Sequence, residues 1–390
     1  MNAMAQDPVA VAEPGADDVF AGRVLVHVVR QYHPMVGGLE DFVRNLVRRQ
    51  VGRFARVKIV TLDRLFTAPQ DVLPARDTLD GAEIVRIPYR GSSRYPLAPQ
   101  VFREIRSADL VHVHAVDFFF DALALGAPLH GRRLIATTHG GFFHTDRHRA
   151  LKAVWFNTLT RLSASRYRGI ACCSESDLET FRHIAPSRVR LIENGADLDK
   201  FAAASASEPV KGLVSIGRFS RNKRLDLLLD AMAALLRKDD GWHLHIAGSA
   251  SDWSVEDVAG MIAARGLSQA VSLHVRPSDE EIRRILGRCS LFASASDYEG
   301  FGIALIEALS AGLVPVVEAN TAFRALARKH DLIRLAAFAQ PERAAQEILA
   351  AWAGLGAAPD ATRQRAIASA AQHGWGETVR RYDDLYRDAL

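Results

Sequence analysis

The stretch Leu291-Phe-Ala-Ser-Ala-Ser-Asp-Tyr-Glu-Gly-Phe-Gly-Ile-Ala-Leu-Ile-Glu307 joins an apolar run to an apolar helix through a turn that contains glycine. We expect a strand at 291–295 and a helix at the end of the stretch, with Gly300 and Gly302 at the junction. Backbone N–H groups at such a helix start, backed by the helix dipole, attract phosphate. Glu299, in the turn, can accept hydrogen bonds from hydroxyls. The stretch therefore indicates sugar-phosphate chemistry.

Length and composition limit the kind of protein. At 390 residues, with 48% hydrophobic and 24% charged residues, the chain suits two soluble, folded domains. Residues 1–200 hold 27 of the 49 Lys and Arg but 22 of the 45 Asp and Glu, which indicates an anionic partner for the first half. The three cysteines offer neither a disulfide framework nor a metal-ligand spacing, as is typical of a reduced cytosolic protein. No signal peptide or spanning stretch is visible, and residues 1–22 are expected to be a disordered extension.

Short runs rich in β-branched residues alternate with helical patterns in the first half. Between the first two runs, the apolar residues from Leu39 to Val47 recur at helical spacing. This alternation predicts an α/β domain with a doubly wound parallel sheet, in which ligands bind at the carboxyl ends of the strands. The expected strands are 24–28, 57–61, 84–87, 110–114, 134–138, 170–173 and 189–192.

The same alternation starts again after the small, polar segment 201–209, which we expect to be a linker. The chain is therefore expected to contain a first domain at 23–205 and a second domain at 206–375, facing each other across a cleft. A final helix at 376–390 is expected to cross back to the first domain. The strands expected in the second domain are 213–216, 243–247, 271–275, 291–295 and 314–317, with a helix at 225–236 after the first of them.

Cations follow the first strand of the second domain, in Gly217-Arg-Phe-Ser-Arg-Asn-Lys-Arg224. Arg218 and Lys223 would stand at the carboxyl end of this strand, where fixed cations stabilise a leaving diphosphate. Cations at a helix start oppose the helix dipole, so another interaction should favour them. The alternative interpretation is a pair of solvated surface cations.

Three features of the first domain follow strand ends. Gly37 and Gly38 permit close approach of the backbone to a phosphate or sugar. A plain loop without a ligand is the alternative. The spacing of the two glycines is not that of a dinucleotide-binding loop. His139 ends a strand beside two glycines, where ligands lie in this kind of fold. Ser174 follows the next strand. Its role is either to bind the donor or to cap the amino terminus of a helix.

Residues 147–168 form a basic, amphipathic segment without any acidic residue. Its apolar residues recur at helical spacing between the cations, which suits an anionic membrane surface or a lipid diphosphate. A core helix with a charged, solvated face is the alternative. No nucleic acid partner is expected, because no RNA-binding or helix-turn-helix pattern is present. The residues expected to contact the acceptor or the membrane are Arg147, Arg149, Lys152, Trp155 and Arg161.

Two acidic residues so close in sequence also suggest a glycosidase. Hydrolases place both carboxyl groups across the scissile bond. Glu307, inside the helix, would instead lie on the far side of the phosphate-binding turn from Glu299. Transfer from a phosphate-activated sugar therefore fits the pattern better.

Together these motifs resemble the retaining glycosyltransferases of family four, whose GT-B fold consists of two Rossmann-like, doubly wound domains facing across a cleft. The resemblance covers about residues 23–390. Arg224 departs from it, because many members have glycine there. The matching residues are Glu299 and Glu307 (the Glu-x7-Glu motif), Arg218 and Lys223 (the diphosphate-binding pair), Gly37 and Gly38 (the glycine loop) and His139 (the sugar-facing histidine).

A finer resemblance is to the α-mannosyltransferases of xanthan and acetan assembly. The segments that carry it are Val26-His-Val-Val-Arg-Gln-Tyr-His-Pro34, Arg90-Gly-Ser-Ser-Arg-Tyr-Pro96, Thr138-His-Gly-Gly-Phe-Phe-His-Thr145 and Glu193-Asn-Gly195. It implies GDP-mannose as donor, cellobiosyl-diphosphopolyprenol as lipid-linked acceptor, and an α-1,3-linked mannose made at the inner face of a bacterial cell membrane.

The resemblance also implies how the site residues divide their roles. His139, Glu299 and Lys223 would be catalytic. No metal or cofactor is expected, because Arg218, Lys223 and the helix dipole would take the place of a metal. The residues expected to bind the donor are Gly37, Gly38, Ser174, Arg218, Lys223, Gly300, Phe301, Gly302 and Glu307.

Other functions stay open at this point. Composition does not distinguish guanine from uracil, so a family-four transferase that uses UDP-glucose is one alternative. A sugar-nucleotide epimerase with the GT-B fold is another, although it would need further acids around the sugar and no lipid acceptor site. A non-catalytic sugar-nucleotide-binding protein would not need the full set of cations, glutamates and histidine.

Overall fold

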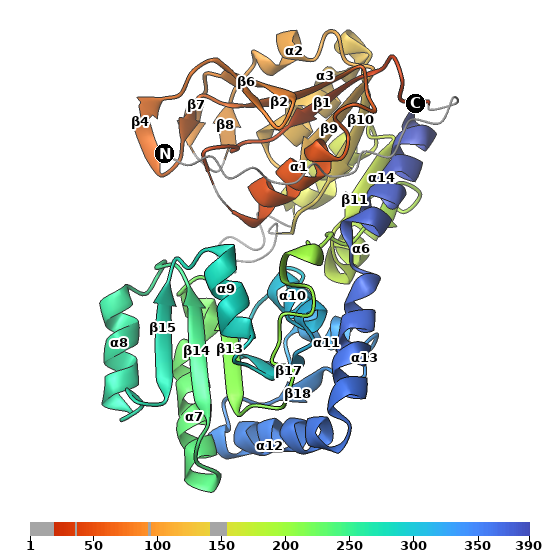
Figure 1. Ribbon diagram of the computed structural model, residues 1–390. Coiled ribbons are helices and arrows are strands. Elements are labelled where there is room, and N and C mark those ends of the chain that lie inside the picture. The colour runs from red at the N-terminus through yellow and green to blue at the C-terminus, as the bar shows by residue number, and fades with distance from the viewer. Residues whose placement is uncertain (1–18, 36, 93–94, 141–153) are drawn as a thin grey trace. The chain divides into compact units, whose positions relative to one another are not determined.

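The computed structural model describes residues 19–35, 37–92, 95–140 and 154–390 (Figure 1). The described chain divides into two units. The first comprises the residues up to Glu193 together with Thr378–Leu390, and the second comprises Asn194–Glu377. Most of the expected N-terminal extension, residues 1–18, lies outside the described ranges.

The first unit is built on an eight-stranded sheet in the order β12-β11-β10-β9-β1-β2-β6-β5. All neighbouring strands are parallel except β5 and β6. Two short hairpins, β3–β4 and β7–β8, lie outside this sheet. The strands are β1 (Val24–Val28), β2 (Arg56–Leu62), β3 (Arg64–Leu65), β4 (Ala68–Val72), β5 (Arg76–Leu79), β6 (Ala82–Ile87), β7 (Arg90–Ser92), β8 (Tyr95–Leu97), β9 (Leu110–His114), β10 (Arg133–Thr137), β11 (Gly169–Cys172) and β12 (Val189–Leu191).

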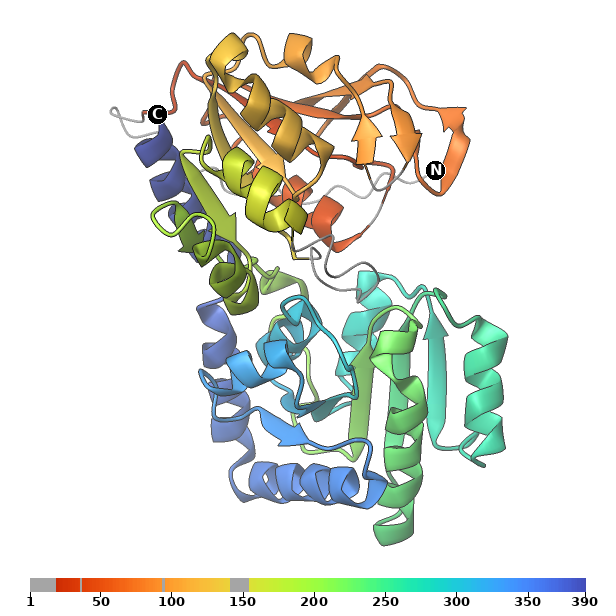
Figure 2. The ribbon, with the colours of Figure 1, turned by 180° about the vertical axis from the view of Figure 1, so that it is seen from behind.

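Alternating side chains give this sheet two different faces. Val26 and Val28 of β1 join an apolar core, whereas His27 between them shares the opposite face with His112 and His114 of β9. Helices α1 and α14 contact the histidine face, and α3 covers the apolar face (Figures 1 and 2). The described helices of this unit are α1 (Gly38–Arg48), α2 (Val101–Glu104), α3 (Phe118–His130), the π-helix η1 (Phe156–Thr160), α5 (Arg161–Ala164), α6 (Glu175–Arg182) and the part of α14 (Trp375–Ala389) from Thr378 onward.

The second unit contains a six-stranded, fully parallel sheet in the order β15-β14-β13-β16-β17-β18. Its strands are β13 (Gly212–Ile216), β14 (His243–Gly248), β15 (Val271–Val275), β16 (Leu291–Ser294), β17 (Val314–Glu318) and β18 (Arg334–Ala336). Its helices are the 3-10 turns η2 (Asp199–Phe201) and η3 (Arg221–Lys223), and α7 (Leu225–Lys238), α8 (Val255–Ala264), α9 (Asp279–Leu286), α10 (Ile303–Ala311), α11 (Thr321–Ala327), α12 (Pro341–Ala357) and α13 (Pro359–Ala371).

Each sheet has one point at which the strand order reverses direction. In the first unit this point lies between β1 and β9, and in the second it lies between β13 and β16. In such doubly wound sheets the connections from the two central strands leave on opposite faces, so a crevice opens at their carboxyl ends. The doubly wound α/β architecture expected from the sequence is thus confirmed for both halves.

All the expected strands are present, with small differences at their ends. The sequence did not predict β5, β18 or the two hairpins. β5 is an antiparallel edge strand with mostly exposed, polar residues, and β18 is only three residues long. Neither therefore shows the apolar pattern of a buried strand.

The segment 201–209 is not the free linker that its small, polar residues predicted. Phe201 is fully buried, and the backbone N–H groups of Ala203 and Ser205 donate to Ser310 and Ala311 at the end of α10. Small side chains let this backbone lie against the helix. The segment therefore belongs to the second unit. This unit begins at Asn194, earlier than the boundary after residue 205 that we expected.

Residues 19–22, expected to belong to the disordered extension, form a turn in which Phe20 is completely buried. Its ring stacks on Phe54 at 4.8 Å between centroids and meets Tyr386 of α14 edge-on. A single aromatic residue after a polar segment gave no periodic pattern, so the sequence could not predict this contact.

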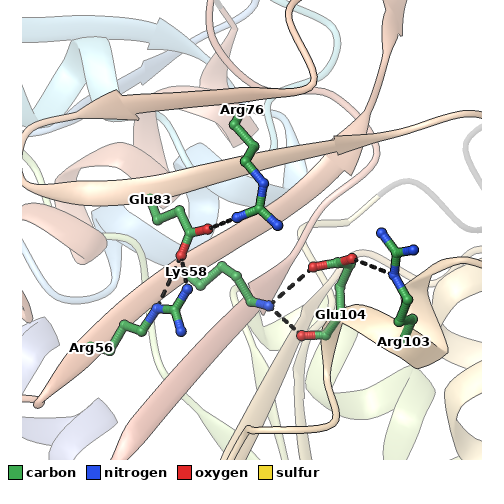
Figure 3. A network of polar contacts seen from close by, with 6 residues as sticks. All are labelled: Arg56, Lys58, Arg76, Glu83, Arg103 and Glu104. Atoms are coloured by element: carbon green, nitrogen blue, oxygen red, sulfur yellow. Dashed lines mark hydrogen bonds and ion pairs between the residues drawn. The ribbon is translucent and has the colours of Figure 1, made fainter.

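An ion-pair network surrounds the amino-terminal end of β2 (Figure 3). Lys58 is buried, and its Nζ lies 3.3 Å from Oε2 of Glu104 and also donates to the carbonyl oxygen of that residue. Burial alone would raise the pKa of Glu104, but its bonds to Arg103 and Lys58 lower that pKa below its usual value. Glu83, by contrast, pairs with the largely exposed Arg56 and Arg76.

Removing Glu104 should be much more costly than removing Glu83, because it leaves the Lys58 ammonium buried without a counter-charge. We expect Glu104→Ala to lower the free energy of unfolding by about 3 kcal/mol. The matched control Glu83→Ala should cost less than about 1 kcal/mol. Urea unfolding followed by circular dichroism measures both, and equal losses would contradict the distinction between a buried and an exposed pair.

Candidate active site

Two glycines shape the exit of β13 in the second unit. Gly217 follows the strand with a φ of +155°, and a Cβ there would lie 3.0 Å from Cε of Lys223. A Cβ on Gly248, at the end of β14, would lie 1.8 Å from the carbonyl oxygen of Gly217. The lysine can therefore pack directly against the backbone at the carboxyl ends of the strands.

Lys223 and Glu299 meet at the switch point between β13 and β16. Nζ of Lys223 lies 2.7 Å from Oε1 of Glu299, and their side chains are 20% and 16% exposed. Asn222 joins the two loops: its carbonyl oxygen accepts from Asp297 N–H at 2.9 Å, and its Nδ2 donates to the carbonyl oxygen of Tyr298 at 3.1 Å. The structure thus brings together Lys223 and Glu299, which are far apart in sequence. Asn222 connects their two loops by hydrogen bonds, and the sequence did not indicate this role.

Arg224 begins α7 in the left-handed conformation, with φ +47° and ψ +49°. Most side chains disfavour this conformation and glycine does not, so glycine would suit this position without strain. The guanidinium of Arg224 pairs with Asp226 and Asp297, at 2.9 and 3.2 Å. The helix α7 that follows is regular, so arginine at position 224 is compatible with the start of this helix.

The amino terminus of α10 is open to an anion. Gly302 caps the helix with a φ of +95°, and its first turn contains no acidic residue. Among the described residues, no group accepts from the backbone N–H of Ile303 or Ala304. Gly300 is exposed, whereas Phe301 is buried beside the ring of His373. The turn therefore provides backbone donors and a positive dipole end, as expected.

Arg218 and Glu307 complete the set expected in this unit. Arg218 is exposed, and no described residue forms an ion pair with it. Glu307 is half-buried in α10 and lies within the electrostatic field of Lys200. Burial would lower the pKa of Lys200, but Glu307 and Asp279 together raise it. Lys200 was missed because it stands next to the segment that was interpreted as a linker.

In the first unit, His139 lies in a tight turn after β10 with a φ of +55°. The carboxylate of Asp177 holds this turn by accepting from the Thr138 hydroxyl and from the Gly140 N–H at 2.9 Å. Nε2 of His139 lies 2.9 Å from Nδ1 of His114, and burial lowers the pKa of His139 to about 3. The imidazole is therefore neutral, and Asp177 is a second positioning residue that the sequence did not indicate.

The glycine loop after β1 differs electrostatically from the turn before α10. Gly37 precedes α1 in an extended conformation, and a Cβ there would lie 2.5 Å from Oε2 of Glu40. Gly38 has open space around its Cα, but Glu40 and Asp41 occupy the first turn of the helix. Acids at this position compensate the dipole, so the loop suits a neutral sugar better than a phosphate.

Ser174 is the N-cap of α6. Its hydroxyl oxygen accepts from the Asp177 N–H at 3.2 Å, which is the helix-capping alternative considered for this residue. A role in donor binding stays a prediction.

The basic segment is described only from residue 154 onward, and Arg147, Arg149 and Lys152 lie outside the described residues. The described part is helical from 154 to 164, and Trp155 and Arg161 are exposed. Its apolar residues at 154, 155 and 162 face solvent, while the buried positions are 156, 160, 163, 164 and 167. The described apolar stripe is therefore not a core face. No helix among the described residues is both long and apolar enough to span a bilayer.

Two family models match the chain. "Glycosyltransferase Family 4" matches residues 36–200, and "Glycosyl transferases group 1" matches residues 199–370. A solved structure of sucrose-phosphate synthase from Thermosynechococcus elongatus is similar in fold, with a TM-score of 0.70 and 18% identity over 94% of this chain and 98% of that one.

Curated relatives match almost the whole chain. A GDP-mannose:cellobiosyl-diphosphopolyprenol alpha-mannosyltransferase of Xanthomonas oryzae pv. oryzae is 44% identical over 94% of this chain and 97% of its own length. A protein of the same name from Komagataeibacter xylinus is 40% identical over 94% of this chain and 93% of its own length. The chain therefore belongs to the family 4 glycosyltransferases and has their GT-B fold.

Proposed function

We propose that the protein is a retaining α-mannosyltransferase that transfers mannose from GDP-mannose to cellobiosyl-diphosphopolyprenol, forming an α-1,3 linkage in an exopolysaccharide repeat unit. The observation that carries this proposal is the 40 to 44% identity, over 94% of the chain, to curated enzymes with this donor and acceptor in their names. The Lys223–Glu299 pair beside the open terminus of α10 gives that activity a chemical site.

The second unit provides the groups that the donor needs. We assign the diphosphate to Arg218, Lys223 and the free N–H groups of α10, because these are the positive elements at the switch point. Glu307 is assigned to the ribose hydroxyls. Without donor, Lys223 and Glu299 neutralise each other; a bound donor would give Lys223 a phosphate and leave Glu299 to accept from mannose hydroxyls.

The first unit contributes neutral groups to the transferred sugar. We assign a mannose hydroxyl to the uncharged His139 and close backbone approach to Gly37 and Gly38, where the acids of α1 disfavour phosphate. In the reaction the bond from the anomeric carbon to phosphate breaks, and a bond from the acceptor oxygen forms on the same face. The acceptor proton goes to the departing phosphate oxygen of GDP, so no cofactor is required.

We also propose that the enzyme binds the inner face of the cell membrane, where its lipid-linked acceptor lies. Val154, Trp155 and Leu162 are 60%, 41% and 50% exposed, with Arg161 and Arg166 exposed among them. Exposed apolar residues interleaved with cations are typical of interfacial helices. The ring of Trp155 lies edge-on to that of Tyr95, with 5.9 Å between the ring centroids.

The neighbouring helix adds apolar surface of the same kind. Ser163 of α5 donates to Asp121 of α3 at 2.7 Å, and Figure 2 shows the two helices on the same face of the sheet. On α3, Leu125 and Leu129 are 50% and 94% exposed.

Incubation with labelled sugar nucleotides tests the reaction and the donor together. With lipid-linked cellobiose present, labelled GDP-mannose should move label into the organic phase, whereas UDP-glucose and UDP-glucuronate should not. The labelled product should be a substrate for α-mannosidase. Transfer from a UDP-sugar would overturn the donor assignment, and a β-linked product would overturn the retaining mechanism.

The proposed division of roles predicts unequal losses in two variants. Lys223→Ala should reduce kcat/KM about a hundredfold or more, since it removes a fixed cation from the departing diphosphate. Glu307→Ala should cost about tenfold through the loss of ribose hydrogen bonds. Arg221, a cation of the same turn that stacks on Trp253 at 5.0 Å, is the matched control, and Arg221→Ala should leave the rate nearly unchanged. Equal losses in the first two variants would argue against these roles.

Membrane binding should depend on salt and on the basic segment. Each arginine at an anionic surface contributes about 1 kcal/mol, so Arg161→Glu with Arg166→Glu should reduce binding to phosphatidylglycerol vesicles by at least about tenfold. The control reverses Arg284 and Arg365, which are exposed arginines of the second unit. Vesicle sedimentation at low and high salt measures the effect. Unchanged sedimentation of the first double variant would refute the membrane role.

A further inference from the structure

Four side chains form a continuous hydrogen-bonded chain from the interior of the first unit to His139. Oε1 of Gln50 lies 2.7 Å from Nε2 of His27, and Nδ1 of His27 lies 2.9 Å from Nε2 of His114. Nδ1 of His114 then lies 2.9 Å from Nε2 of His139. Gln50, His27 and His114 are almost completely buried. The chain thus starts below the carboxyl end of α1 and ends at the proposed sugar-binding histidine.

A second arm leaves the other end of the same amide. Nε2 of Gln50 donates to the Tyr386 hydroxyl of α14 at 2.7 Å, and that hydroxyl lies 2.9 Å from Nδ1 of His112. The arm continues from Nε2 of His112 through the Thr137 hydroxyl to the Tyr382 hydroxyl, each step 2.8 Å. We call the hydrogen bonds from Gln50 to His139 the first arm and those from Gln50 to Tyr382 the second arm. Gln50 joins the two arms.

The histidines of the chain are neutral, because burial lowers the pKa of His27 to about 4 and that of His114 well below its usual value. A neutral imidazole has one donor nitrogen and one acceptor nitrogen. All hydrogen bonds between Gln50 and His139 must therefore run in the same donor-to-acceptor direction. Imidazoles and hydroxyls can reverse that direction by moving protons. An amide cannot, because its donor and acceptor atoms exchange only when the side chain rotates. Gln50 therefore sets the direction.

The observed orientation of Gln50 fixes each ring in turn. Its Oε1 can only accept, so His27 donates from Nε2 and accepts at Nδ1. His114 then donates from Nε2 and accepts at Nδ1, and His139 donates from Nε2. The remaining Nδ1 of His139 carries a lone pair, and among the described residues nothing donates to it.

A metal ion is the other chemistry that this cluster suggests, since ligand atoms of His27, His112 and His114 lie within 4.8 Å of one another. Each ring nitrogen of these three residues already has a hydrogen-bond partner. A cation would have to break several of those bonds. The arrangement favours a hydrogen-bonded chain.

We propose that Gln50 is a positioning residue that fixes the tautomer of His139, so that Nδ1 of His139 accepts a hydrogen bond from a hydroxyl of the transferred sugar. The proposal rests on the assignment of His139 to that sugar. An acceptor at this position favours a ligand hydroxyl over a carbonyl or phosphate oxygen, neither of which can donate.

The test compares Gln50→Leu with Tyr382→Phe in the full-length enzyme. Both remove a buried polar group from the network, but only the first cuts the arm that leads to His139. Histidine labelled with nitrogen-15 in the ring reports the tautomer by NMR, and the His139 resonances are assigned by their loss in His139→Gln. Steady-state kinetics with GDP-mannose and lipid-linked cellobiose are measured on the same proteins.

In the unsubstituted enzyme we expect His139 to be protonated at Nε2 and not at Nδ1. Gln50→Leu should give a mixture of both tautomers and lower kcat/KM about fivefold, the value of one hydrogen bond. Tyr382→Phe should keep the tautomer and change kcat/KM by no more than about twofold. If Gln50→Leu does not fold, Gln50→Met, whose unbranched side chain is closer to glutamine in shape, takes its place with the same expectation.

Three results would overturn the proposal: protonation of Nδ1 in the unsubstituted enzyme, an unchanged tautomer in Gln50→Leu, or the same change in Tyr382→Phe. Failure of the proposed function is distinguishable from these results. It would appear as absence of mannose transfer by the unsubstituted enzyme, whereas the tautomer is read from the spectra alone.

Discussion

The reversal of strand order in each sheet is the constraint on which the sites depend. In the second unit β13 continues into α7 and β16 into α10, and these helices belong to separate apolar clusters. In the first unit β1 continues into α1 and β9 leads to α3, on opposite faces of the sheet. The carboxyl ends of the central strands are left between diverging connections. Lys223 and Glu299 follow β13 and β16, so the strand order alone makes neighbours of residues that are far apart in the chain.

Local backbone strain accompanies both sites, and each strained turn has a visible restraint. Arg224 and His139 have positive φ angles, a conformation that costs of order 1–3 kcal/mol for such residues. Two carboxylates hold Arg224, and Asp177 holds the residues on either side of His139. These restraints keep both turns in the conformation that places Lys223 and His139 at the carboxyl ends of the strands. A relaxed turn at Arg224 would move the residue that precedes it, Lys223, away from Glu299.

Periodic patterns predicted the framework well because buried parallel strands are largely apolar, and β16, whose four residues are all buried, shows this directly. Glycine turns and charged residues at strand ends then indicated Lys223, Glu299 and His139. Contacts made by single residues were not predictable. Phe20 reaches Tyr386 of the last helix, and Asn222 holds the loop of Asp297, yet neither contact leaves a periodic trace in the sequence. Nothing in the sequence indicated that His114 of β9 lies within hydrogen-bonding distance of His139.

The two units solve the problem of placing polar groups at a switch point in different ways. In the second unit the groups are charged and near the surface, where solvent limits the cost of holding Lys223 beside Glu299. In the first unit they are neutral and buried, where ions would be prohibitively desolvated, and each ring nitrogen of His27 and His114 has a partner. Charge suits a diphosphate, whose own charge must be compensated as it departs. A neutral, directional network suits hydroxyl groups, because each hydroxyl can donate one hydrogen bond and accept others without carrying a charge.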